Sequence, residues 1–127
     1  MPIDVERQVK HWRHGALEDL EAARDLVARG HHRHGLFFAH LALEKLLKAH
    51  ICRDSAGLPP RIHNLVRLVQ QTSFEPAEEH LDVLAEMNAF NIEGRYPEHL
   101  LPAPTPGEAA RYLERTEEVF GWLNRQW

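Results

Sequence analysis

Three polar residues recur at four-residue steps along an otherwise apolar stretch of this chain. The stretch, LFFAHLALEKLLKAHI, covers residues 36–51, and the three residues are His40, Glu44 and Lys48. A spacing of four places side chains on the same side of an α-helix. A helix that is apolar around most of its circumference is normally covered by its neighbours. We therefore expect this polar line to be internally paired, exposed through a gap in the packing, or used in function.

The lysines of this stretch suit phosphate binding. Lys45 and Lys48 are two of the three lysines in a chain with twelve arginines. In a groove, both ammonium groups would contact the phosphates of a nucleotide. A structural role is the alternative, and for Glu44 we prefer it: a buried carboxylate requires hydrogen-bond partners, here His63 or Arg95. For the two lysines both roles stay open.

A second group with chemical potential is Arg95, Tyr96 and His99. Arginine holds phosphate through two parallel hydrogen bonds, and tyrosine stacks on nucleobases. The alternative is structural: Tyr96 packs against the protein while Arg95 pairs with an acid such as Glu93 or Glu44. A third group, residues 31–34 (His-His-Arg-His), contains imidazoles that suit zinc, but no acid or cysteine lies at matching spacing. We expect a solvated linker there, and we predict neither a metal nor a cofactor.

The elements that must position these residues are all helical by their apolar spacing. We expect a long helix over residues 4–29, a linker over residues 30–35, a second helix ending near Arg53, and a loop over residues 54–60. The apolar face of the first helix comprises Val5, Val9, Trp12, Ala16, Leu20, Ala23 and Val27. Because the linker is short, the second helix must return antiparallel to the first.

The second half of the chain predicts three further helices. Asn64 is a strong N-cap for a short helix, and a longer helix follows over residues 77–90 with Leu81, Leu84, Ala85 and Asn88 on one face. Residues 91–106 are expected to be irregular. The last helix begins with a complete capping box, Thr105 and Glu108. Its predicted core face comprises Ala109, Leu113, Thr116, Phe120, Leu123 and Trp127. No stretch has strand periodicity, so we predict an all-α, up-and-down antiparallel four-helix bundle with one additional short helix, forming a single domain over residues 1–127.

Composition limits the classes of function. A net charge of −4 argues against a protein that coats nucleic acid by bulk electrostatics. No apolar run reaches the roughly 18 residues of a membrane span, and the N-terminus lacks the apolar core of a signal peptide. The single cysteine, Cys52, fits a reducing compartment. We therefore expect a cytoplasmic protein without a membrane association.

Three segments, in order, resemble the HEPN family (higher eukaryotes and prokaryotes nucleotide-binding). They are FFAHLALEKLLKA (37–49), RIHNLVRLV (61–69) and EGRYPEH (93–99). The family's A-Q-Q-A-x-E-K-x-L-K-A core is matched by residues 39–49, except that His40 and Leu41 replace the glutamines. The resemblance implies a helical bundle that usually dimerises. It also implies, for many small bacterial members, a neighbouring minimal nucleotidyltransferase, sometimes in a toxin–antitoxin pair.

Other family members are metal-independent RNases with an R-x4–6-H motif inside the bundle, at the dimer interface. Two matches to this spacing, Arg29–His34 and Arg33–His40, lie near the first interhelical linker and not at the family position. In the segment nearest to that position, Arg95 and His99 are separated by three residues, one fewer than the motif needs, and Pro97 lies between them. An enzyme of this type would need the histidine for acid–base chemistry and the arginine for the phosphate. The departure makes a binding protein the better prediction.

The sequence thus predicts a nucleotide- or nucleic-acid-binding HEPN module that forms a homodimer and acts with a minimal nucleotidyltransferase. The expected nucleotide contacts are Lys45, Lys48, His63, Arg95 and Tyr96. The expected structural polar seam comprises His40, Glu44 and Asn64. The alternatives are a metal-independent RNase toxin that uses Arg95 and His99, and a dimeric interaction scaffold without catalytic activity.

Overall fold

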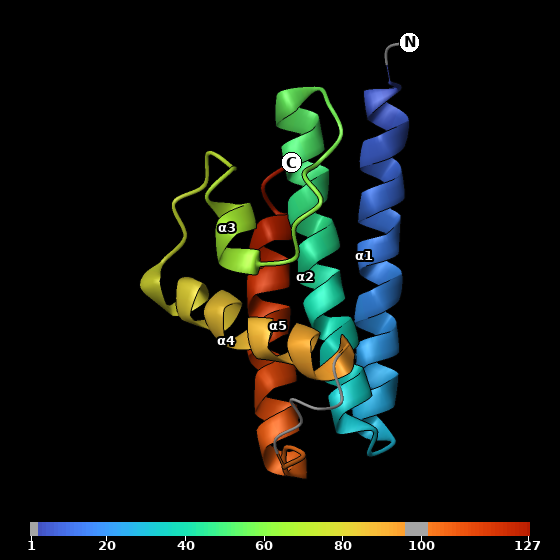
Figure 1. Ribbon diagram of the computed structural model, residues 1–127, viewed down its shortest axis with the longest axis vertical. Coiled ribbons are helices and arrows are strands. Elements are labelled where there is room, and N and C mark those ends of the chain that lie inside the picture. Colours follow the sequence, from blue (N-terminus) through green and yellow to red (C-terminus); the bar gives the residue numbers. More distant parts are fainter. Residues whose placement is uncertain (1–2, 96–101) are drawn as a thin grey trace.

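A computed structural model describes residues 3–95 and 102–127, apart from the side chains of residues 92–95. The described chain is all-helical and contains no strand, which confirms the predicted fold class (Figure 1). Its helices are α1 (Val5–Ala28), α2 (His32–Ser55), α3 (Leu65–Val69), α4 (Glu78–Arg95) and α5 (Pro106–Asn124). Within these described residues, no helix is both long and apolar enough to span a membrane.

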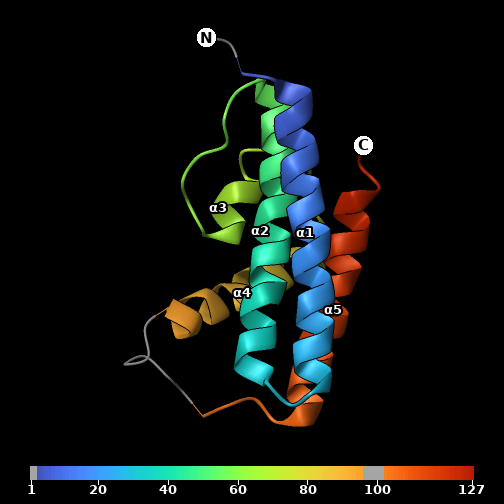
Figure 2. The ribbon, with the colours of Figure 1, turned by 90° about the vertical axis from the view of Figure 1, so that its right-hand side faces the viewer.

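The helix α2 lies at the centre of the fold. It contacts each of the other four helices. Figures 1 and 2 show α1 antiparallel to α2 and α5 lying lengthwise beside them, while α4 crosses the long axes of these three helices. Fourteen of the 24 residues of α2 are buried, against four of the 24 in α1. Because neighbours cover α2 on nearly every side, its apolar residues occupy most of its circumference, as the sequence indicated.

The predicted linker over residues 30–35 is wrong, because α2 already begins at His32. The chain reverses at Gly30, whose φ of 86° is a left-handed conformation that favours glycine. Gly35 lies in the first turn of α2, against α1. A Cβ atom placed there would come within 2.6 Å of Val27 Cγ2 and 3.1 Å of the Ala23 carbonyl oxygen. The second glycine therefore serves close packing between two helices and not a turn.

The helix α4 also differs from its predicted form. It continues to Arg95, five residues beyond the predicted end at Phe90, because a single glycine at position 94 does not break a helix. Among residues 78–91 of this helix, the buried ones are Val83, Leu84, Met87 and Phe90. Ala85, which was predicted on the core face, is exposed. Since α4 crosses the other helices, the crossing selects which side of it is buried.

The predicted helix starts are confirmed where the signal is local. The Asn64 side chain accepts a hydrogen bond from the Arg67 backbone amide at 3.1 Å. Thr105 and Glu108 form both hydrogen bonds of the capping box, 3.1 Å and 2.9 Å long. On α5, Ala109, Thr116, Phe120 and Leu123 are buried as predicted. Leu113 is half-buried, and Trp127 follows the end of the helix with 38% of its surface exposed.

Candidate functional site: a histidine held by a buried carboxylate

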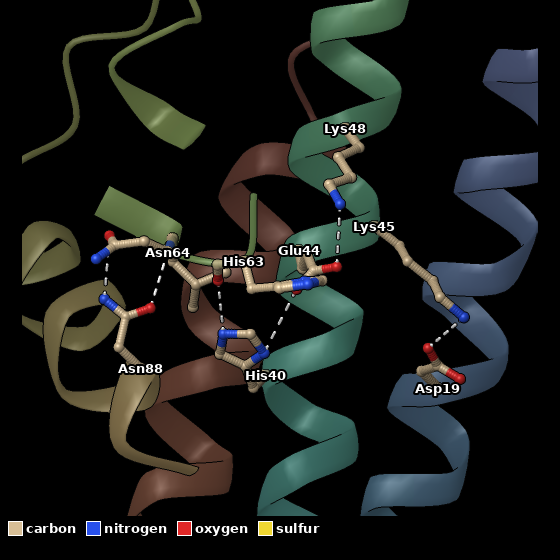
Figure 3. A network of polar contacts seen from close by, with 9 residues as sticks. Asp19, His40, Glu44, Lys45, Lys48, His63, Asn64 and Asn88 are labelled. Atoms are coloured by element: carbon tan, nitrogen blue, oxygen red, sulfur yellow. Dashed lines mark hydrogen bonds and ion pairs between the residues drawn. The ribbon is translucent and has the colours of Figure 1, made fainter. Parts of the chain in front are cut away.

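Glu44 is the centre of a polar network at the junction of α2 and α3 (Figure 3). Its Oε2 accepts a hydrogen bond from Lys48 Nζ at 3.2 Å, and its Oε1 accepts one from His63 Nδ1 at 3.0 Å. The side chains of Glu44 and Lys48 are each only 6% exposed. A carboxylate and an ammonium group at this depth need mutual pairing and hydrogen bonds, and the network supplies both.

His40 lies one turn before Glu44 on α2 and contacts the backbone of His63. Its Nε2 lies 3.0 Å from the carbonyl oxygen of His63 and donates the hydrogen bond, since a carbonyl oxygen only accepts. Its Nδ1 lies 3.9 Å from Glu44 Oε1, and the residue is fully buried. His63 is therefore held by α2 at two points, one in the side chain and one in the backbone.

The next residue, Asn64, ties α3 to α4. Its Oδ1 accepts from Asn88 Nδ2 at 3.3 Å, in addition to capping α3. Asn88 Oδ1 in turn accepts from the Leu65 backbone amide at 2.9 Å. Sequence reasoning placed Asn88 on the predicted apolar stripe of its helix and missed this role. An amide side chain at a stripe position was the available signal, because such a group needs polar partners when half-buried.

The geometry leaves His63 Nε2 without a hydrogen-bond partner among the described residues. Since His63 Nδ1 donates to Glu44, the lone pair of the neutral imidazole lies on Nε2. The side chain of His63 is 47% exposed, although its orientation is set by buried groups. A histidine oriented in this way can accept a proton or a hydrogen bond from a ligand. Its exposure exceeds that of Lys45 and Lys48, the expected nucleotide contacts on α2.

Both lysines of α2 face carboxylates. Lys48 is buried against Glu44, and its ammonium group also lies 5.6 Å from the Trp12 ring centre. Lys45 points the other way, toward α1, where its Nζ lies 2.8 Å from Asp19 Oδ2 (Figure 3). Gly15 leaves room for this side chain, because a Cβ there would lie 3.3 Å from Lys45 Cδ. Lys45 remains 31% exposed, so it is the more accessible of the two.

The second predicted group is only partly visible. Arg95 is the last residue of α4, and Tyr96 and His99 lie outside the described residues. Of the two partners considered for Glu44, the structure therefore describes the hydrogen bond to His63.

Further sequence predictions concern the cysteine and the other potential metal ligands of the chain. Cys52 is fully buried, and this burial raises the pKa of its thiol, so Cys52 offers no exposed nucleophile. In the part of the chain that is described, no three His, Cys, Asp or Glu residues are grouped so as to hold a metal ion. The histidines at positions 32 and 34 lie in the first turn of α2, and His31 directly precedes it.

Comparison with known proteins places this geometry in a family. The HEPN domain matches residues 9–126, nearly the whole chain. No sequence among curated proteins matches. The fold is similar to the crystal structure of TT1696 from Thermus thermophilus, with a TM-score of 0.81 and 20% identity, covering 94% of this chain and 98% of the other. It is also similar to ST0689, described as an archaeal HEPN homologue, with a TM-score of 0.72 and 20% identity, covering 93% and 96%. This chain belongs to the HEPN family.

Proposed function

We propose that this HEPN protein binds a nucleotide or nucleic acid beside the junction of α2 and α3, with His63 as a direct contact. One observation supports the proposal most: a half-exposed imidazole is oriented by a buried glutamate and its paired lysine. Buried charges cost free energy, and here they orient a side chain that faces solvent. Arg95 and Tyr96 are proposed as further contacts, whereas Lys45 points toward α1 and away from this junction. Lys48 supports the site by balancing the charge of Glu44.

Calorimetric titration of ATP, GTP and a short RNA onto the purified protein tests this proposal. We expect binding of at least one ligand, and His63→Ala should weaken it on the order of tenfold, the loss of one hydrogen bond. His34→Ala is the matched control, because His34 is an exposed histidine in the first turn of α2. No binding of any of the three ligands, with or without a partner protein, would overturn the proposal. Equal affinity in both variants would remove His63 from it.

We further propose that the protein forms a homodimer and acts with a minimal nucleotidyltransferase in a toxin–antitoxin-like pair. Family membership supports this, since many small members carry such a neighbour. Light scattering of the purified protein should give twice the mass of the chain, and coexpression with a minimal nucleotidyltransferase should give a stable complex. A monomer that captures no such partner would contradict both statements. Dimerisation and capture without ligand binding would instead favour the interaction scaffold.

The RNase alternative rests on Arg95 and His99, in the segment nearest to the family position of the catalytic motif, and Arg95 is the last residue of α4. Incubation with mixed RNA in the presence of EDTA should then give cleavage that disappears in His99→Ala. Intact RNA at high protein concentration would end that alternative.

A further inference from the structure

His63 carries a nucleophilic atom that ligand binding alone does not require. Its Nδ1 donates to Glu44 at 3.0 Å, so the neutral ring presents the Nε2 lone pair, and nearly half of the side chain is exposed. The hydrogen bond from His40 to the His63 carbonyl holds the backbone as well. A histidine with one nitrogen on a carboxylate and the other accessible has the arrangement of an activated nucleophile.

The segment that carries His63 is basic, which favours an anionic reactant. Residues 55–74 contain no aspartate or glutamate, and their charged residues are Arg61 and Arg67, two and four positions from His63. Both arginines are exposed. Neither guanidinium has a carboxylate partner within residues 3–91 and 102–127. Because Lys48 balances Glu44, the segment retains a net positive charge that attracts anions.

We propose that His63 Nε2 is a phosphoryl-acceptor site that reacts with an acyl phosphate. The Nε2 lone pair attacks phosphorus, and the bond from phosphorus to the acyl oxygen breaks as the carboxylate leaves with the electron pair. The Nδ1 proton stays on the ring, and the positive charge that develops there faces the Glu44 carboxylate. No other proton or oxidant is needed. Glu44 is the positioning residue of this step. The proposal goes beyond nucleotide binding and does not depend on it.

The intact protein incubated with acetyl phosphate tests this proposal, with the phosphorylated histidines identified by mass spectrometry at alkaline pH. We expect the mass of one phosphoryl group on His63, added on the order of tenfold faster than on other exposed histidines. His11 and His34 are internal controls, because both are exposed and neither contacts a carboxylate in the described structure. His63→Gln should lose the modification at this position and leave the controls unchanged.

Variants of Glu44 test whether the hydrogen bond to Glu44, and not solvent exposure alone, makes His63 reactive. Glu44→Gln should lower the rate at His63 to that of His11 while the rates at His11 and His34 stay the same. Because this change leaves Lys48 without its carboxylate, Glu44→Gln with Lys48→Met is measured beside it, and circular dichroism verifies the fold of both. Three results would overturn the proposal. They are no modification of His63, equal rates at all exposed histidines, and a rate at His63 that Glu44→Gln does not change. Modification without nucleotide binding would leave it standing and remove only the proposed function.

Discussion

Glu44 joins α2 to the segment before α3, and its removal should lower the stability of the protein. Glu44→Ala leaves the buried Lys48 ammonium without a counter-charge, so we expect a loss of roughly 3–5 kcal/mol in the free energy of unfolding. Urea denaturation measures it. The double variant Glu44→Ala/Lys48→Met should recover much of the loss, because it removes both charges.

The matched control is the pair of Asp25 and Arg29 at the end of α1, which has the same four-residue spacing but is about 70% exposed at both side chains. Asp25→Ala should change stability little, since exposed ion pairs contribute little. Equal losses of stability in Glu44→Ala and Asp25→Ala would show that burial of the network does not determine its contribution to the free energy of unfolding.

His50 should make the stability of the protein depend on pH. Burial lowers the pKa of His50 to about 4; nearby Arg53 and Arg13 lower it too, while Asp54 and the hydrogen bond to the Leu123 carbonyl oppose the change. In the unfolded chain the pKa is near 6.5, so between pH 6.5 and 4 the unfolded state binds more protons. Stability is therefore full above pH 6.5 and falls as the pH drops toward 4, by roughly 3 kcal/mol in total.

Urea midpoints measured from about pH 7.5 to about pH 4.5 check this prediction. His50→Gln keeps a donor for the Leu123 carbonyl but cannot take up a proton, so its stability should vary less across the range. Identical pH profiles for both proteins would assign the acid sensitivity to other groups.

Close packing between α1 and α2 depends on Gly35. In Gly35→Ala the new methyl group would lie 2.6 Å from Val27 Cγ2, so the Val27 side chain or the spacing of the two helices must change, at a cost of roughly 1–3 kcal/mol. Gly107→Ala is the matched control, because this glycine also lies in the first turn of a helix but has no atom within 4 Å of the added methyl. It should be neutral or stabilising by up to about 1 kcal/mol. Thermal unfolding of both variants compares them, and equal melting temperatures would exclude the steric explanation.

Trp127 connects elements that lie far apart in the sequence. Its ring stacks on His50 of α2 with a centroid distance of 3.8 Å, and the Arg13 guanidinium of α1 lies 4.1 Å from the ring centre. Arg53 also lies over this ring, at 4.8 Å, and donates to the Gln126 carbonyl. We expect Trp127→Ala to lose roughly 1–3 kcal/mol of stability, and Trp127→Phe to lose less because it keeps an aromatic ring. Urea denaturation with intrinsic fluorescence measures both, and no change in Trp127→Ala would contradict the stacking contribution.

The family, the all-helical fold and most helix starts could be predicted because their signals are local. The side chains of Asn64 and Thr105 cap amides three residues away, and the apolar face of a helix repeats within four residues. The pairing of Glu44 with His63 was one of two expectations, because a buried carboxylate requires a donor. The residue type shows that a buried carboxylate needs a hydrogen-bond donor. It does not show which of the candidate donors the fold brings to it.

The features that could not be predicted depend on how the helices cross, and no local sequence pattern indicates the crossing geometry. The crossing of α4 over the bundle exposes Ala85 and buries Val83, although a periodic stripe favoured the opposite choice. Packing of α1 against α2 places Gly35 inside a helix and gives Lys45 a carboxylate on α1. Periodicity and capping act over one helical turn, whereas these contacts join residues distant in the sequence. The sequence alone predicts the polar line of His40, Glu44 and Lys48 on α2. Its role in orienting His63 follows from the tertiary structure, because the chain folds back over that helix.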